Sequence, residues 1–177
     1  LLAGALEVDD PISVNHGMLN HSESINHKAV VFNNITEADG LRSAVNVLAR
    51  DRLCEIFNVS PGELIDILAW AMANPSEPQL VNSENAPVLE NTQDSVDLTK
   101  LPIPWHYPED RGRYQSASVI IAQYQGVRNM SFHRQFLRDR NHCVSRFVPR
   151  HLRTMTDKAR ANGEEIDIAV VNGPDAT

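Results

Sequence analysis

The sequence predicts a mixed α/β (α+β) chain: an N-terminal α/β domain followed by the first part of a β-barrel. Residues 58–75 carry an apolar pattern at helical spacing between a capping signal and a proline, and residues 114–171 contain several short β-type runs. A proline-rich stretch separates the two regions. With 42% hydrophobic and 22% charged residues, the 177-residue chain has the composition of an ordinary globular protein with a real core.

The first domain is assigned to residues 1–112. Residues 1–27 hold scattered turn formers and three histidines, with no carboxylate or cysteine at metal-ligand spacing. Residues 28–35 form a short apolar run that is typical of a strand. Residues 41–57 place apolar side chains near helical spacing, which predicts two helical segments.

The helix expected within residues 58–75 has both end signals. Ser60 is the expected N-cap, Pro61 follows at the first helical position, and Glu63 completes a capping box. Pro75 is expected to stop the helix. The face expected to be buried carries Ile65, Leu68, Ala69 and Met72, and Trp70 is expected in the core or at an interface.

The exit from the first domain is rich in proline, with six prolines between residues 75 and 108. Residues 78–81 and 86–91 are interpreted as short strands. Residues 98–114 are expected to form an extended loop, because each proline lacks a donor and disfavours helix in the residue before it. The domain boundary is placed near residue 112.

The second domain is assigned to residues 113–177 and is expected to be incomplete. Its helix, within 149–164, carries Leu152, Met155 and Ala159 on one face and has Gly163 near its end. The chain stops in the turn expected after its last strand, which suggests a fragment of a longer protein. Strands are expected at 114–125, 130–138, 143–148 and 166–171, and turns at 126–129, 139–142 and 172–176.

Charge and cysteine content narrow the function classes. The net charge of −7 argues against a general nucleic-acid binder. Residues 128–153 nevertheless gather seven arginines against one acid, Asp139, which fits either an anion site or a solvated basic face. Cys54 and Cys143 are isolated, and no cationic, apolar signal peptide is visible, so a reducing, cytoplasmic compartment is expected. No apolar run approaches the roughly 20 residues of a membrane span.

Several motifs, in order, resemble the UbiD family of decarboxylases. Residues 97–114, "DLTKLPIPWHYPEDRGRY", are similar to the family's Leu-Pro-x-Pro stretch and the acidic-Gly-x-Tyr turn after it. Residues 126–137, "GVRNMSFHRQFL", resemble its Asn-x-[Ser/Gly]-x-[Tyr/His]-Arg strand. Residues 145–176 resemble its next strand, helix, strand and Gly-x-[Asp/His]-Pro-like turn. The likeness also runs back through 28–35 and 61–75.

This resemblance implies a non-oxidative decarboxylase or carboxylase of unsaturated or aromatic carboxylic acids. The family uses prenylated FMN, supplied by a flavin prenyltransferase, whose phosphate is held by Mn²⁺ or another divalent metal with K⁺ nearby. It implies a split β-barrel that binds the flavin from residue 113 onward, and a homo-oligomer at full length. The acidic metal ligand and the proton donor are expected beyond Thr177.

The family's functional residues carry over onto positions of this chain. Asn129 matches the metal-binding asparagine, and His151 matches a metal or phosphate contact at a helix start. Arg134 matches the arginine that contacts the cofactor and faces the substrate carboxylate, which gives it the catalytic role. The remaining matched flavin-lining positions are Phe132, His133, Arg146, Phe147, Val148 and Leu152.

Strand alternation constrains this site. In a regular strand Asn129, Ser131 and His133 point one way and Arg134 the other. Both Asn129 and Arg134 can therefore reach one pocket only if the strand bends or bulges between them. On composition alone, Asn129 could be a turn former, Arg134 a solvated strand residue and His151 a helix-start residue without a metal.

The substrate is left open among several alternatives. The segment "VPRHL" differs from the Arg-Gly-Gly form of ubiquinone-pathway members and looks more like archaeal members, some of which decarboxylate anhydromevalonate phosphate. A 4-hydroxybenzoate-type decarboxylase is the alternative enzyme. A non-catalytic flavin-binding split-barrel module would also explain the strands and arginines, and a structural interaction domain would explain the proline-rich segment alone.

Overall fold

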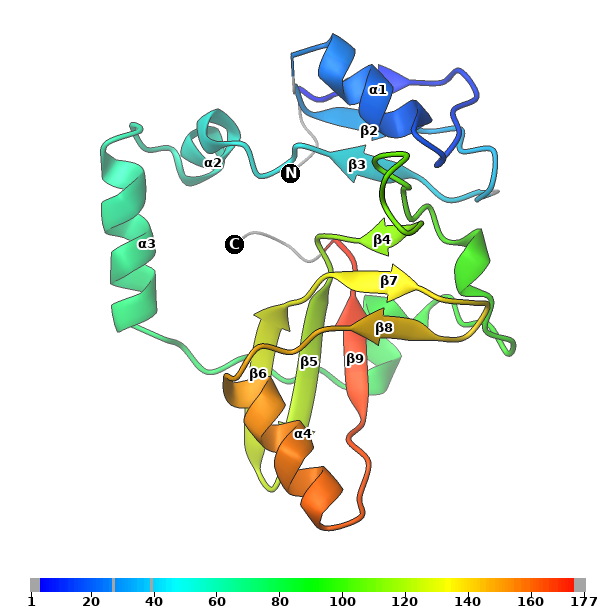
Figure 1. Ribbon diagram of the computed structural model, residues 1–177. Coiled ribbons are helices and arrows are strands. Elements are labelled where there is room, and N and C mark those ends of the chain that lie inside the picture. The colour runs from blue at the N-terminus through cyan, green and yellow to red at the C-terminus, as the bar shows by residue number, and fades with distance from the viewer. Residues whose placement is uncertain (1–3, 27, 39, 174–177) are drawn as a thin grey trace.

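The computed structural model describes residues 4–26, 28–38 and 40–173. Within them, the strands form three three-stranded sheets, one in the N-terminal region and two in the C-terminal region. Figure 1 shows the N-terminal sheet at one end of the molecule and the two C-terminal sheets running across one another at the other end.

The N-terminal sheet is a small βαβ unit with an added edge strand. β1 (Leu6–Val8) pairs in parallel with β2 (Val30–Phe32), and β3 (Ser43–Val45) pairs antiparallel with β2. Helix α1 (Gly17–Ser24) connects β1 to β2 and covers the sheet (Figure 1). The core between them contains Val14, Met18, Val30, Phe32, Ile35 and Ala38. The strand expected within residues 28–35 is confirmed, whereas β1 and α1 were not expected.

The two helical segments expected in residues 41–57 are only half correct. The second is α2 (Arg50–Phe57), but the first is strand β3. Residues 43–45 form a strand in spite of the helical spacing of their apolar side chains. The open edge of β2 offers them backbone hydrogen-bond partners, and this pairing outweighs the local helical preference. Asn46 ends the strand with a φ of 57°, and its side chain donates to the Ser22 hydroxyl at 2.8 Å.

Helix α3 (Glu63–Ala73) confirms the helix expected in residues 58–75. The Glu63 carboxylate accepts hydrogen bonds from the Ser60 backbone N–H at 2.9 Å and from its hydroxyl at 2.6 Å, which is half of a capping box. The expected burial is wrong, since Ile65 is 64% exposed and Met72 is 85% exposed. Helix α3 packs only lightly on α2, and Leu64 is its one buried residue.

The proline-rich segment contains no strand among its described residues, which corrects the interpretation of 78–81 and 86–91. It forms three short 3₁₀ turns: η1 (Ser83–Asn85), η2 (Pro87–Leu89) and η3 (Leu98–Lys100). Pro78 and Pro87 each remove a backbone donor, and no neighbouring strand offers a partner that would compensate. The extended loop expected at 98–114 is confirmed in outline.

Arg113 fixes this loop onto the rest of the chain. Its guanidinium donates to the main-chain carbonyls of Thr99, Leu101 and Ile103 at 2.5–2.9 Å. Burial lowers the pKa of Arg113, and the nearby Glu37 carboxylate opposes that shift. A further backbone bond joins Trp105 N–H to Val14 O at 2.8 Å, so the loop bridges the N-terminal sheet and the strands that follow.

The C-terminal region consists of two antiparallel sheets and one helix, and the domain boundary near residue 112 stays a prediction. One sheet has the order β4-β7-β8 and the other the order β6-β5-β9. Helix α4 (His151–Ala161) packs on the second sheet (Figure 1). The strands are β4 (Tyr114–Gln115), β5 (Val119–Tyr124), β6 (Val127–Phe132), β7 (Gln135–Leu137), β8 (Cys143–Ser145) and β9 (Ile168–Val171). The described strands do not close into a barrel, so the split barrel stays a prediction.

The bounds of four expected segments in this region are wrong. The strand expected at 114–125 splits into β4 and β5 around the buried Ser118, where the chain passes from one sheet to the other. The turn expected at 126–129 lies instead at Gln125 and Gly126, with φ values of 50° and 80°, which is a two-residue hairpin turn. The strand expected at 130–138 is broken into β6 and β7, and β8 ends at Ser145.

The expected helix and last strand are confirmed. Helix α4 buries Leu152, Met155 and Ala159 against Ile120 and Ala122 of β5. Gly163 follows the helix with a φ of 72°, the left-handed conformation that ends helices well. Strand β9 pairs antiparallel with β5. The turn expected at 172–176 falls mostly outside the described residues, as does His27, and both cysteines are free thiols.

Candidate functional site

A row of polar side chains lies along β6 on the face that α4 covers. Asn129 pairs with Ala122 and Ser131 with Ile120, and both partners belong to the core under α4. The Asn129 amide nitrogen donates to the Ser131 hydroxyl at 3.0 Å, and that hydroxyl lies 2.9 Å from His133 Nε2. The expected alternation is therefore confirmed, and Asn129 is a strand residue rather than a turn former.

The chain leaves the sheet directly after this row. β6 belongs to the β6-β5-β9 sheet and β7 to the β4-β7-β8 sheet, so residues 133–134 form the bend that a common pocket would require. The Arg134 guanidinium carbon lies 5.0 Å from the centroid of the Tyr114 ring, and the Arg134 carbonyl accepts the Ser145 hydroxyl at 3.1 Å. These contacts hold Arg134 against β4 and β8.

Residues 146–150 connect β8 to α4 and bring further expected residues to the row. The Phe147 ring lies 5.0 Å from the His133 ring in an edge-on arrangement and packs against the core under α4. Val148 is 46% exposed beside it. His151 is the exposed first residue of α4, whose N-cap residue, Arg150, makes no side-chain capping bond.

Two expected flavin-lining residues lie apart from the row. Phe132 is 65% exposed and points to the opposite face of β6, because it follows Ser131 in a regular strand. The Leu152 side chain is buried in the core under α4, so only its main chain at the first turn of the helix is accessible to a ligand.

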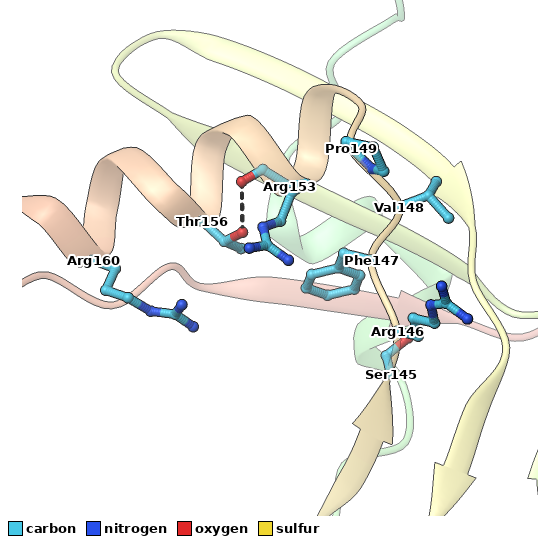
Figure 2. A pocket seen from close by; sticks show the side chains of 8 residues that line it. All are labelled: Ser145, Arg146, Phe147, Val148, Pro149, Arg153, Thr156 and Arg160. Carbon is cyan, nitrogen blue, oxygen red and sulfur yellow. Dashed lines mark hydrogen bonds between the residues drawn. The ribbon is translucent and has the colours of Figure 1, made fainter.

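A pocket with a volume of about 640 Å³ lies between α4 and the 145–149 segment. Figure 2 shows the Arg153 side chain directed toward the Phe147 ring, with Arg160 and Arg146 at opposite ends. Arg153 Nε donates to both carboxylate oxygens of Asp157, at 2.9 and 2.7 Å. The pocket is lined by Ser145, Arg146, Phe147, Val148, Pro149, Arg153, Thr156 and Arg160.

A second cavity of about 510 Å³ lies between the two C-terminal sheets. One wall of this cavity is apolar and is formed by Ile120, Ile168 and Val170. The other wall is more polar and is formed by Gln115, Gln135 and Cys143. Gln115 is 7% exposed, and no protein group bonds its side-chain oxygen among the described residues. Burial raises the pKa of the Cys143 thiol and so favours its protonated form.

Sequence reasoning missed several of these residues. Tyr114 and Ser145, which contact Arg134, lie on strands whose pairing could not be predicted from local patterns. Arg153 was counted only as part of the basic run at 128–153, and Arg160 was not considered. Their spacing of seven residues puts both on one side of a helix. That spacing was the signal that could have identified the pocket.

The metal expectation is supported by ligand chemistry only in part. Among the described residues, no three His, Cys, Asp or Glu side chains come together as a metal site. The Asn129 hydrogen bond to Ser131 uses the amide nitrogen and leaves the carbonyl oxygen for a hard cation, which prefers such oxygens. The described helices also include none that is long and apolar enough to cross a bilayer.

The fold matches solved UbiD-class enzymes. An evolved dimeric form of HmfF from Pelotomaculum thermopropionicum, in complex with prFMN, superposes with a TM-score of 0.85 at 26% identity. The match covers 93% of this chain and 40% of that one. The apo 3,4-dihydroxybenzoic acid decarboxylase (AroY) of Klebsiella pneumoniae gives a TM-score of 0.85 at 22% identity. That match covers 94% of this chain and 38% of the other, and it supports the fold alone.

Sequence comparison agrees with the fold. Residues 79–177 match the profile of the UbiD 3-octaprenyl-4-hydroxybenzoate carboxy-lyase Rift-related domain, and the chain therefore belongs to the UbiD family. The resemblance read from the motifs is thus confirmed.

Among curated relatives, two archaeal enzymes named anhydromevalonate phosphate decarboxylase are similar to most of this chain. The one from Methanosarcina mazei is 35% identical over 150 residues, which is 84% of this chain and 34% of the relative. The one from Methanothermobacter thermautotrophicus is 31% identical over 173 residues, which is 97% of this chain and 40% of the relative. This chain thus spans between a third and two fifths of their length.

Proposed function

We propose that the protein is a prenylated-FMN-dependent decarboxylase whose substrate is a phosphorylated, unsaturated carboxylic acid of the anhydromevalonate phosphate type. The observation that carries this proposal is the bend at residues 133–134. It separates a metal-suited row headed by Asn129 from an arginine suited to a carboxylate, while keeping both on one short segment. The similarity to archaeal anhydromevalonate phosphate decarboxylases supports the choice of substrate.

Asn129 and His151 would hold the divalent metal, Mn²⁺ in the first instance, with K⁺ nearby. Both residues lie on the side of the β6-β5-β9 sheet that α4 covers. Because no side chain caps α4, the amides of its first turn, including that of Leu152, are free to donate to the flavin phosphate. Among the described residues, no group of three His, Cys, Asp or Glu side chains could complete this site.

Arg134 would hold the substrate carboxylate through a two-point contact, which the planar guanidinium allows and a lysine does not. Its position over the Tyr114 ring limits the orientations of the guanidinium before substrate arrives. Prenylated FMN, when bound, supplies the electron sink for loss of CO₂. Orienting and charge-stabilising roles then fall to this chain.

His133 and Phe147 would form one wall of the flavin site, since their rings already contact one another. Arg146 and Val148 would extend that wall along the segment before α4, whereas the Phe132 side chain points away from it on the outer face of β6. The mixed aromatic and cationic lining suits a planar, anionic cofactor.

The direct test uses the protein expressed from its complete reading frame together with a flavin prenyltransferase. We expect purified protein with the absorbance of prenylated FMN, bound Mn²⁺, and CO₂ release from anhydromevalonate phosphate. Flavin binding without turnover of this acid or of 4-hydroxybenzoate would instead support a non-catalytic flavin-binding module. Light scattering on the same sample tests the proposed homo-oligomer.

A further inference from the structure

We propose that the pocket beside α4 is a phosphate-monoester site in which Arg153 and Arg160 hold the phosphate of the substrate. This inference rests on the proposed function and deepens it, because it assigns residues to the end of the substrate remote from the carboxylate. Neither arginine belongs to the metal row or to the Arg134 contact described above.

The charge of this pocket is local and unbalanced. Three of its eight lining residues are arginines and none is acidic, although the whole chain has a net charge of −7. Among the described residues, Arg146 and Arg160 form no ion pair. A cluster of three arginines of which only Arg153 is paired, with Asp157, favours binding of an anion in a concave site.

The two helical arginines are positioned by a rigid element. Arg153, Thr156 and Arg160 follow one another at spacings of three and four residues, which places them on one side of α4. The adjacent stripe of α4 is buried against β5, so the helix cannot rotate away from the pocket. Figure 2 shows the Arg153 and Arg160 side chains extending from the same side of the helix.

Asp157 orients Arg153 without occupying its recognition face. Both carboxylate oxygens of Asp157 contact only the Nε atom of Arg153, at 2.7 and 2.9 Å. The two terminal nitrogens, which form the fork suited to a phosphate, have no recorded bond within the described chain. Asp157 is therefore a positioning residue for the guanidinium.

One residue that lines the pocket also contacts the main chain of Arg134. Ser145 lines the pocket and donates to the Arg134 carbonyl at 3.1 Å. Phe147 also lines the pocket and offers it an apolar surface. The apolar carbon chain of a substrate whose phosphate is held by Arg153 and Arg160 would then pack on Phe147. This arrangement matches the chemistry of a phosphorylated, unsaturated acid.

The test compares anhydromevalonate phosphate with the same acid lacking its phosphate, using the cofactor-loaded protein from the complete reading frame. We expect Arg160→Ala and Arg153→Ala to lower kcat/KM for the phosphorylated acid about tenfold or more, since each removes a charge-assisted bond. Turnover of the unphosphorylated acid should be unchanged. The matched control is Lys158→Ala, which removes a cation from α4 that does not line the pocket.

Other outcomes overturn the assignment. Equal losses for both acids, or no loss for either, would exclude a substrate-phosphate site. Loss of flavin absorbance in the arginine variants would assign the pocket to the cofactor phosphate instead. If the wild-type protein turns over neither acid, the proposed function fails, and calorimetric titration with methyl phosphate still tests the pocket. Binding lost in Arg160→Ala but kept in Lys158→Ala would then support it, and equal binding in both would refute it.

Discussion

The guanidinium of Arg134 lies over the ring of Tyr114, 5.0 Å from its centroid, although the two residues are twenty positions apart. The contact exists because β4 and β7 pair antiparallel, with Tyr114 opposite Phe136, two residues beyond Arg134. Strand pairing therefore positions the arginine that is proposed to bind the substrate carboxylate.

Arg134→Lys should not preserve activity. Lysine keeps the charge but loses the planar fork that fixes a carboxylate in two directions. Misplacement of a reacting group can cost about 100-fold in rate, so we expect kcat/KM to fall by at least that factor with flavin content unchanged. The control is Arg138→Lys, at an exposed arginine whose contact with Asp139 is a loose 3.9 Å. Near wild-type turnover in Arg134→Lys would refute the role, and joint loss of flavin would make Arg134 a cofactor ligand.

Tyr114→Leu should have a smaller effect of the same kind. A cation–π contact near the surface contributes about 0.5–1 kcal/mol, so kcat/KM should fall about two- to fivefold while Arg134 remains present. Steady-state kinetics of the single and double variants would measure the coupling. Purely additive effects of Tyr114→Leu and Arg134→Gln, which removes the cation, would show that the ring does not act through the arginine.

Asn129→Ala should lower the metal content before it lowers stability. The amide oxygen of Asn129 is the proposed ligand, whereas its nitrogen makes one partly buried bond to Ser131, worth about 1 kcal/mol. Asn129→Asp, which keeps a hard oxygen, should retain metal. Elemental analysis paired with thermal melts separates the cases, and unchanged metal content with a lower melting temperature would reduce Asn129 to a structural residue.

The sequence predicted elements with strong local signals and failed where tertiary pairing decided. Helices α3 and α4 carried capping and periodic signals and were found. Strand β3 was predicted as helix because its three residues take their conformation from the edge of β2. The hairpin turn was misplaced because Gln125, an unusual residue for a positive φ, precedes Gly126.

The list of candidate site residues stays a prediction, and only part of their arrangement could be predicted from the sequence. Alternation correctly put Asn129, Ser131 and His133 on one face, and it correctly required a bend before Arg134. The burial of Leu152 and the outward direction of Phe132 depend on which side of the sheet α4 covers. That choice is made by packing between distant segments, which no local pattern encodes.

Truncation of Leu152 should lower the free energy of unfolding far more than truncation of Ile65. Leu152→Ala removes a buried side chain from the core between α4 and β5 and should cost about 2–5 kcal/mol. Ile65→Ala, on the exposed face of α3, should stay within about 0.5 kcal/mol in this 177-residue chain. Urea unfolding of both variants provides the measurement. A large cost for Ile65→Ala would mean that α3 is covered in solution, as its apolar sequence predicts.

Glu37 should stabilise the chain in a pH-dependent way. Its carboxylate accepts from the Ser13 hydroxyl and from the Val14 N–H at 3.0 Å, next to the Trp105 contact with the same segment. Burial alone would raise the pKa of Glu37, but these hydrogen bonds and the Arg113 charge outweigh it, so the pKa is lowered. The folded state therefore binds the Glu37 proton less readily than the unfolded state does.

The sign of the effect follows from that shift. The stability from Glu37 is fully present above its unfolded pKa of about 4.3 and is lost as the pH falls through the lower folded-state value. Glu37→Gln keeps an acceptor oxygen but loses the charge, so it should be about 1 kcal/mol less stable than wild type at pH 7, a value reduced for solvent screening at this partly exposed site. The difference in unfolding free energy between wild type and Glu37→Gln should become smaller in urea titrations at progressively lower pH. Glu77→Gln, at an exposed linker position, is the control. If this difference in unfolding free energy stays constant down to about pH 3, Glu37 stabilises the chain through its shape and not through its charge.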